Sequence, residues 1–396
     1  MQIPPNGPRF PEAAPAVPAA PPSSPPPPVA GPTQTAAEPA DTDAVQARAS
    51  APEGQEPNQM QFPEPLDRSD ESKKKSYSDV WDFHADPGAA RPNVTSRAQL
   101  EQALGNRNTE TVQRLLDHLD ENGLLNSRTM TDIATFSQRH GSQAVDQVAE
   151  QLLDFHQNGN PIDGVSKDQI VRNALHDIAF PSDIDQGNYG TCGAAALQMK
   201  MALEQPADYT RALTALSQNE NYRTPGGATM RPNNTWQQDN NDNRNMSARI
   251  MQNAIMNLAR QGMIWDGSYD SADDENDSGL TRSQQNAALR QLTGNSDYTN
   301  ESSGLITSRQ DLYQYLEDDL SRGRATIVSF DGHAVLVTGL DKSSEPPEVI
   351  LNSWGRQYAM SVDEFITHVR AVRSVDDRGW DEQQTPAGRL TQVGDR

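Results

Sequence analysis

Proline is concentrated at the start of this chain of 396 residues: residues 1–65 hold 18 of the 28 prolines and almost no aliphatic side chains. Such a segment cannot bury enough apolar surface to offset the entropy lost on ordering. We therefore expect residues 1–75 to be a disordered Pro/Ala/Ser-rich segment. This segment accounts for part of the low hydrophobic fraction of the chain, 34%. We expect the folded part of the chain to lie in the remaining residues.

The charge of the chain and its lone cysteine, Cys192, exclude several classes of protein. The formal net charge is −22, which disfavours nucleic acid because its phosphates require basic groups. One cysteine cannot form an intrachain disulfide or a cysteine-based zinc site. No apolar run approaches the roughly 18 residues of a membrane span, and the first residues lack the features of a secretory signal. We expect no metal, cofactor, nucleic-acid partner or membrane span, and leave the oligomeric state open.

Residues 76–180 contain apolar positions at helical spacing and are expected to form an α-helical domain. Asn122-Gly123 and Asn158-Gly159 mark a faint repeat that resembles a paired EF-hand in outline. Position twelve of the two loops is Thr129 and Val165, where calcium needs an acid. We therefore favour helix packing over cation binding. Targeting, partner binding and a pro-region remain open as roles for this region.

The residue pattern of the chain changes near residue 181, where a short glycine-rich loop precedes an apolar helix expected over 193–204. Further helices are expected around 250–258 and 312–320. The runs 325–330, 334–340 and 349–351 are typical of strands. These patterns predict an α+β domain over 181–370, followed by a C-terminal tail over 371–396.

Cys192 lies where a glycine-rich loop meets the start of a helix. Unpaired backbone N–H groups and the helix dipole at such a position favour the thiolate, which is the nucleophilic form of cysteine. Gln186 lies six residues upstream, where its amide could help to form an oxyanion hole. A buried structural cysteine is the alternative for Cys192 taken alone.

A thiolate nucleophile needs a base, and the base needs an orienting group. His333 opens one predicted strand and Asn352 ends the next. Adjacent antiparallel strands would place the two side by side, so that the amide oxygen of Asn352 could accept a hydrogen bond from the imidazole of His333. This arrangement predicts a Cys–His–Asn site.

The order of these motifs resembles the papain-like family of cysteine proteases over roughly 181–368. They are Gln-Gly-x-x-Gly-x-Cys ending at Cys192, His-Ala-Val beginning at His333, and Asn-Ser-Trp-Gly beginning at Asn352. The separation of 141 residues between Cys192 and His333 agrees with the ~130–150 typical of that family. The resemblance implies a two-lobed fold, with a helical lobe and an antiparallel β-barrel-like lobe.

The resemblance also implies residue roles. Cys192 would be the nucleophile, His333 the general base and acid, Asn352 its orienter, and Gln186 an oxyanion donor. The residues implied in substrate binding and in shielding the His–Asn pair are Gly226, Gly227 and Trp354. The chain departs from the family where Gly193 and Ala194 follow the nucleophile, and where Tyr189 replaces a disulfide cysteine.

These features predict a cysteine peptidase that acts on a protein or peptide substrate through a thioester acyl-enzyme. The alternatives are an acyltransferase or deamidase acting on protein glutamine, and a non-catalytic papain-fold binding module. The proline-rich start and the lack of disulfides resemble a bacterial effector or toxin. Such a protein would be delivered by a specialised secretion system into the cytosol of a target cell, where it would meet a host protein. An ordinary cytoplasmic protease is the alternative location.

Overall fold

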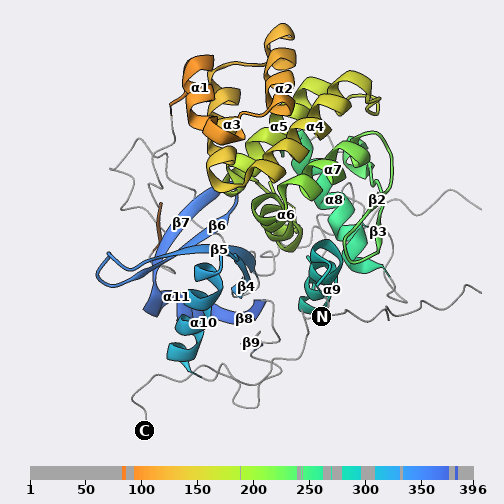
Figure 1. Cartoon of the computed structure of the whole chain (residues 1–396). Helices are drawn as coiled ribbons and strands as arrows, with labels where there is room; N and C mark the ends of the chain where they lie inside the picture. Colours follow the sequence, from red (N-terminus) through yellow and green to blue (C-terminus); the bar gives the residue numbers. More distant parts are fainter. Residues whose placement is uncertain are drawn as a thin grey trace, which may run out of the picture. The chain divides into compact units, whose positions relative to one another are not determined.

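The computed structural model describes residues 83–85, 93–187, 189–238, 242, 244–261, 269, 279–295, 308–330, 333–373 and 380–381. The expected disordered segment 1–75 lies outside these residues, as does most of the expected tail 371–396. The described part is α+β, with helices packed on an antiparallel sheet (Figure 1).

The first group of helices lies between residues 93 and 180. These helices are α1 (Arg97–Leu104), α2 (Glu110–Glu121), α3 (Ser127–Arg139), α4 (Ser142–Asn158) and α5 (Lys167–Ala179). The side chains of Ser96, Thr109 and Asn126 accept N-cap hydrogen bonds that satisfy otherwise unpaired N–H groups. Helix α2 packs on α4 and α3 packs on α5, so the faint sequence repeat corresponds to two helix pairs that pack together.

The second group of helices follows the 3₁₀ turn η3 (Pro181–Asp183). Its members are α6 (Cys192–Glu204), α7 (Pro206–Ser217), α8 (Met246–Arg260) and α9 (Arg282–Thr293). A hairpin of β2 (Tyr222–Arg223) and β3 (Thr229–Met230) lies between α7 and α8. A single hydrophobic core has members from Val94 to Leu336. It is continuous in space because α4 and α5 pack on α7, and α5 also packs on α6 and α8. The domain boundary expected at residue 180 does not separate two hydrophobic cores. The different roles expected for the two sides of this boundary stay predictions.

The sheet has the strand order β1-β7-β6-β5-β4-β8-β9 and is antiparallel throughout. Its strands are β1 (Phe83–Ala85), β4 (Thr326–Phe330), β5 (His333–Asp341), β6 (Glu348–Ser353), β7 (Arg356–Ser361), β8 (Val369–Arg373) and β9 (Trp380–Asp381). It is an open sheet among the residues described, where the resemblance implied a barrel-like lobe. Strand β1, which precedes α1, therefore belongs to the same sheet as β5, the strand that begins with His333.

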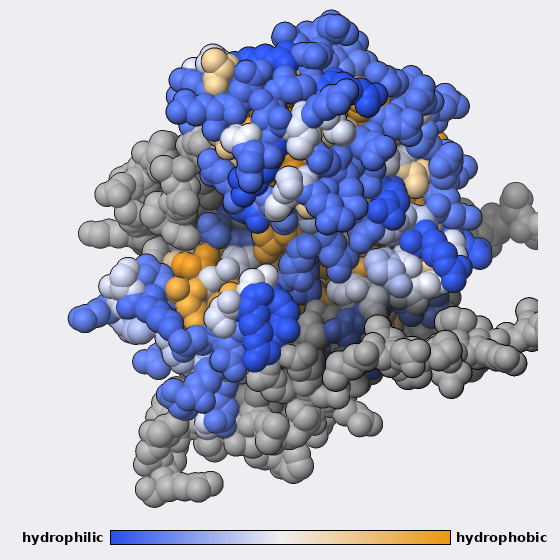
Figure 2. Space-filling view, in the orientation of Figure 1, coloured by the Kyte–Doolittle hydropathy of each residue, from blue (hydrophilic) through white to orange (hydrophobic). Residues whose placement is uncertain are grey.

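The side chains of β5 point alternately to the two faces of the sheet. A hydrophobic core covers each face. Ala334 and Leu336 belong to the core that contains α6, whereas Val335 and Val337 pack in a second core. That second core is formed with α10 (Arg309–Ser321) and α11 (Val362–His368). In Figure 2 the described surface is mostly hydrophilic, and hydrophobic side chains are visible in the hollow between the first helices and the sheet.

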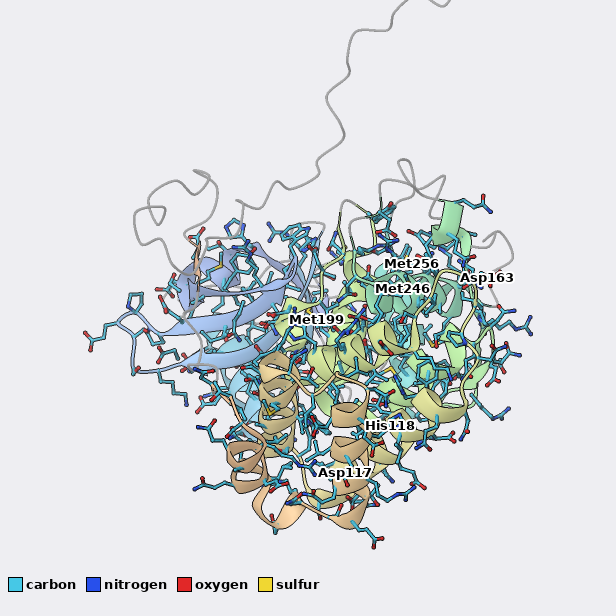
Figure 3. The ribbon with its side chains drawn as sticks, turned by 90° about the horizontal axis from the view of Figure 1, so that it is seen from above. Asp117, His118, Asp163, Met199, Met246 and Met256 are labelled. Atoms are coloured by element: carbon cyan, nitrogen blue, oxygen red, sulfur yellow. The ribbon has the colours of Figure 1, made fainter. Side chains whose placement is uncertain are left out.

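A buried lysine ties the end of α6 to the start of β4. Lys200 is only 3% exposed, and its Nζ donates to the carbonyl of Ala325 at 2.6 Å and to the carboxylate of Glu204 at 2.6 Å. The same carboxylate accepts from the N–H of Ala325 at 2.7 Å. Because both charges are hydrogen-bonded, the pair is tolerated in the interior. Figure 3 shows Met199, one residue away, where the helices meet the sheet.

Candidate active site

Cys192 is the first residue of α6, as the sequence predicts to within one residue. Thr191 makes no side-chain cap bond to the helix, and its hydroxyl donates to Gln252 at 2.8 Å. The N–H groups of Cys192 and Gly193 face the sulfur. Helix α9 approaches closely at Gly193, where a Cβ would lie 3.2 Å from Gln285 Nε2. Glycine thus allows α9 to pack against the start of α6.

The sulfur of Cys192 lies against the strand that carries His333. The backbone N–H of Ala334, the residue after His333, faces the thiol. On another side, a Cβ at Gly279 would lie 3.9 Å from the sulfur. Burial raises the pKa of the Cys192 thiol and outweighs the N–H groups that favour the thiolate. The sequence predicted a thiolate here, whereas the structure favours the neutral thiol.

His333 is held on two sides by the end of β6 and the residue after it. Its Nε2 lies 2.7 Å from the hydroxyl of Ser353. Its ring stacks on the indole of Trp354, with centroids 4.0 Å apart and planes 9° apart. Burial lowers the pKa of His333 to about 3, so the imidazole is neutral near pH 7. The structure therefore brings His333 and Trp354 together.

The expected contact between His333 and Asn352 is not formed. The register of β5 and β6 pairs Asn352 with Leu336, which lies three residues from His333, or about 10 Å along the strand. The amide oxygen of Asn352 is buried and has no hydrogen-bond partner. Ser353 lies one residue nearer the end of β6 and reaches the imidazole in its place. A spacing argument identifies neighbouring strands but not their register, and here the register decides which residue meets His333.

Gln186 is 7% exposed and its amide donates to the carbonyl of Tyr189 at 2.9 Å. The amide is thus used within the loop in this conformation. The guanidinium of Arg244 lies 4.0 Å from the centre of the Tyr189 ring, a cation–π contact. Arg244 also pairs with Asp242 at 2.7 Å, and the side chains of both are fully buried.

Gln252 of α8 holds both ends of the loop that precedes Cys192. Its Nε2 donates to the carbonyl of Asp185 at 2.8 Å, and its Oε1 accepts from Thr191 at 2.8 Å and from Arg244 at 3.3 Å. The side chain is fully buried, so these bonds also satisfy a polar group that would be costly to bury alone. The loop is therefore fixed at both ends and, through Tyr189, in its middle.

The glycine pair implied in substrate binding lies in the turn of the β2–β3 hairpin. The N–H of Gly226 donates to the carbonyl of Gln291 in α9 at 2.8 Å, and a Cβ there would lie 2.6 Å from the carbonyl of Arg290. Gly227 has φ +90°, a conformation that favours glycine. In the structure Gly226 serves packing of the hairpin on α9, and its role in substrate binding stays a prediction.

The described residues hold no group of three or more His, Cys, Asp and Glu side chains arranged to bind a metal ion. A cavity of about 530 Å³ lies at the C-terminal end of α6, with Leu203 and Glu204 in its wall. That end is about 18 Å from Cys192 at 1.5 Å per helical residue. The cavity is therefore separate from the thiol. None of the helices in the described ranges is long and apolar enough to cross a membrane.

His176 anchors η3, the turn before the active-site loop. Its ring nitrogens lie 3.2 Å from Asp132 and 3.1 Å from Asp183. Burial alone would lower the pKa of His176, but the two carboxylates outweigh it and raise the pKa to about 9. An unfolded histidine titrates near 6.5.

We expect the free energy of unfolding to fall as the pH rises from about 6.5 to about 9. The raised folded-state pKa of His176 stabilises the fold fully below the unfolded value, and this contribution is lost as pH passes through the folded value. Urea unfolding across this range measures the slope. In His176→Gln the slope should be shallower, and an unchanged slope would contradict the assignment.

Comparison of the chain with models of known protein families, with curated proteins and with solved structures finds no match. The site therefore has to be interpreted from its own residues. Sequence reasoning missed Ser353, Arg244 and Gln252. One signal was present for Gln252, which has apolar residues four positions away on either side in α8, Ala248 and Met256.

Proposed function

We propose that this chain is a cysteine peptidase with a papain-like arrangement of helical and sheet lobes. The observation that carries the proposal is the position of its only cysteine. Cys192 starts a helix whose N-terminus packs against the strand that begins with His333, and Trp354 covers the imidazole. A nucleophile and a base on two packed elements, with the base covered from water, support nucleophilic catalysis.

In the proposed reaction, the proton of the Cys192 thiol passes to the imidazole of His333 as the sulfur attacks the peptide carbonyl. The N–H of Cys192 stabilises the resulting oxyanion, and Gln186 joins it when its amide leaves the carbonyl of Tyr189. The C–N bond then breaks, and the imidazolium gives its proton to the departing amine. Water attacks the thioester, the acid product leaves, and the thiol is restored.

The proposed substrate is a protein or peptide, and the proposed setting is the cytosol of a target cell reached through a specialised bacterial secretion system. The support is the disulfide-free chain with its single free cysteine. A reducing cytosol does not endanger a site held by hydrogen bonds, ion pairs and apolar packing.

The test is digestion of a peptide library by the full chain, combined with labelling by an active-site-directed epoxide. We expect peptide cleavage and a single label on Cys192, with both lost in Cys192→Ala. His333→Ala should lose cleavage. The absence of cleavage and label in a folded wild-type chain would refute the proposal.

Two alternatives give different outcomes. Ammonia release without cleavage would indicate the deamidase, and transfer of an acyl group to an added amine would indicate the acyltransferase. The neutral thiol and the missing His333–Asn352 bond favour the third alternative, a non-catalytic binding module. That module would bind peptide equally well in Cys192→Ala and release neither product.

A further inference from the structure

We propose that Ser353, rather than Asn352, is the residue that positions the imidazole of His333 for proton transfer. The proposal rests on the proposed cysteine-nucleophile chemistry. Its starting observation is the 2.7 Å contact between Ser353 Oγ and His333 Nε2. Asn352, whose place in the sequence suggests this role, has a buried amide oxygen without a partner.

The burial of Ser353 determines what its hydroxyl can do. Ser353 is 1% exposed, so its hydroxyl is inaccessible to a substrate and is excluded as a nucleophile. His333 is 7% exposed, and Trp354 covers one face of its ring. Water is thus largely kept from the Nε2 edge, and Ser353 is the hydrogen-bond partner of this nitrogen.

A hydroxyl can donate or accept a hydrogen bond, whereas an amide oxygen only accepts, so Ser353 can pair with either tautomer of the neutral ring. When Nε2 carries the proton, Ser353 Oγ accepts from it, and the lone pair lies on Nδ1. In that tautomer Nδ1 is the ring nitrogen that can take a proton from Cys192. Once Nδ1 has taken the thiol proton, the imidazolium carries a proton on each nitrogen and Ser353 still accepts from Nε2. The bond is stronger in this charged state than in the neutral one, so Ser353 favours the transition state over the resting site.

The low pKa of His333 fits a neutral partner. A carboxylate beside the ring would raise the pKa of the imidazole, whereas a hydroxyl does not add charge. A site with a neutral thiol and a neutral imidazole moves a proton only as the nucleophile attacks. The orientation of the ring at that moment is then critical, and the Ser353 hydrogen bond holds the ring in place together with the Trp354 stack.

The experiment compares Ser353→Ala, Ser353→Thr and Asn352→Ala with the wild-type chain on one cleaved peptide. We expect Ser353→Ala to lower kcat about 10- to 100-fold, the range for a hydrogen bond to a charged group, with KM nearly unchanged. Ser353→Thr keeps the hydroxyl and should recover most of the rate. Asn352→Ala should lose less than Ser353→Ala. The matched control is Ser217→Ala, a fully buried serine of α7 whose hydroxyl donates to Thr214.

A second readout does not depend on hydrolysis. In ¹⁵N-histidine-labelled Cys192→Ala protein, the Nε2 resonance of His333, assigned with His333→Gln, should shift when Ser353→Ala is added and should stay in place when Asn352→Ala is added. If wild type cleaves no peptide but this shift is seen, the proposed function fails and the positioning by Ser353 stands. If folded Asn352→Ala loses more kcat than Ser353→Ala, or Ser353→Ala leaves the resonance unchanged, the assignment to Ser353 is overturned.

Discussion

Replacement of Arg244 by methionine should lower the free energy of unfolding by about 3–5 kcal/mol, the usual cost of removing one partner of a buried ion pair. Both side chains of the Asp242–Arg244 pair are fully buried, with the charged atoms 2.7 Å apart. The substitution would leave the buried carboxylate of Asp242 with only the more distant cation of Arg249, at 3.6 Å. It would also remove the cation–π contact with Tyr189 and a hydrogen bond to Gln252. Urea unfolding followed by circular dichroism measures the change.

The double variant Asp242→Asn/Arg244→Met should recover much of the lost stability, because both fully buried charges are removed. The matched control is Arg211→Met, which removes a surface pair whose side chains are 54% and 30% exposed and should cost less than about 1 kcal/mol. An equal loss for the buried and the surface arginine would contradict the role assigned to the buried pair. Amide exchange in the loop before Cys192 should increase only in the Arg244 variants.

Alkylation of Cys192 by iodoacetamide should accelerate about tenfold for each pH unit between 6 and 9, or about 1,000-fold in all, because only the thiolate reacts. Burial raises the pKa of the thiol, so the thiolate fraction keeps rising across this range. Burial also lowers the pKa of His333 to about 3. The imidazole is then neutral and does not stabilise the thiolate of the resting protein.

A resting thiolate–imidazolium pair would give the opposite profile. The rate would be nearly constant from about pH 5 to pH 8, because the thiolate would already be formed. Such a plateau would contradict the neutral site. The measurement is clean because Cys192 is the only cysteine of the chain, and Cys192→Ala provides the blank. In His333→Gln the slope should remain, since the neutral imidazole contributes no charge.

Elements with a strong periodic pattern were predictable from the sequence, and polar elements were not. The apolar helix α6 and the strands β4, β5 and β6 lie close to the expected ranges. Helix α9 was missed because its sequence is rich in glutamine and its buried positions include Gln284 and Gln285. A local signal existed, since Thr281 and Gln284 form a capping box and Gly294 ends the helix in the left-handed conformation.

The candidate site was predictable in its residue types more than in its geometry. The helix start at Cys192 and the strand start at His333 follow from local pattern. The partner of His333 does not, because it depends on strand register, which is set by the packing of the whole sheet. The clamp formed by Arg244 and Gln252 was hidden for a similar reason. It joins residues that are distant in the chain, and a polar side chain in a polar stretch gives no sign of which loop it will hold.

The continuous core has a consequence for proteolytic processing of this chain. A cut after residue 180 would separate α5 from α6, α7 and α8, on which it packs. Apolar residues that are fully buried in the intact chain, such as Leu213 and Ile255, belong to this same core. Release of the first helices would uncover part of that core, and large exposed apolar surfaces promote aggregation. We therefore expect the first helices to stay attached to the rest of the chain, because shedding them would expose the core on which α6 packs.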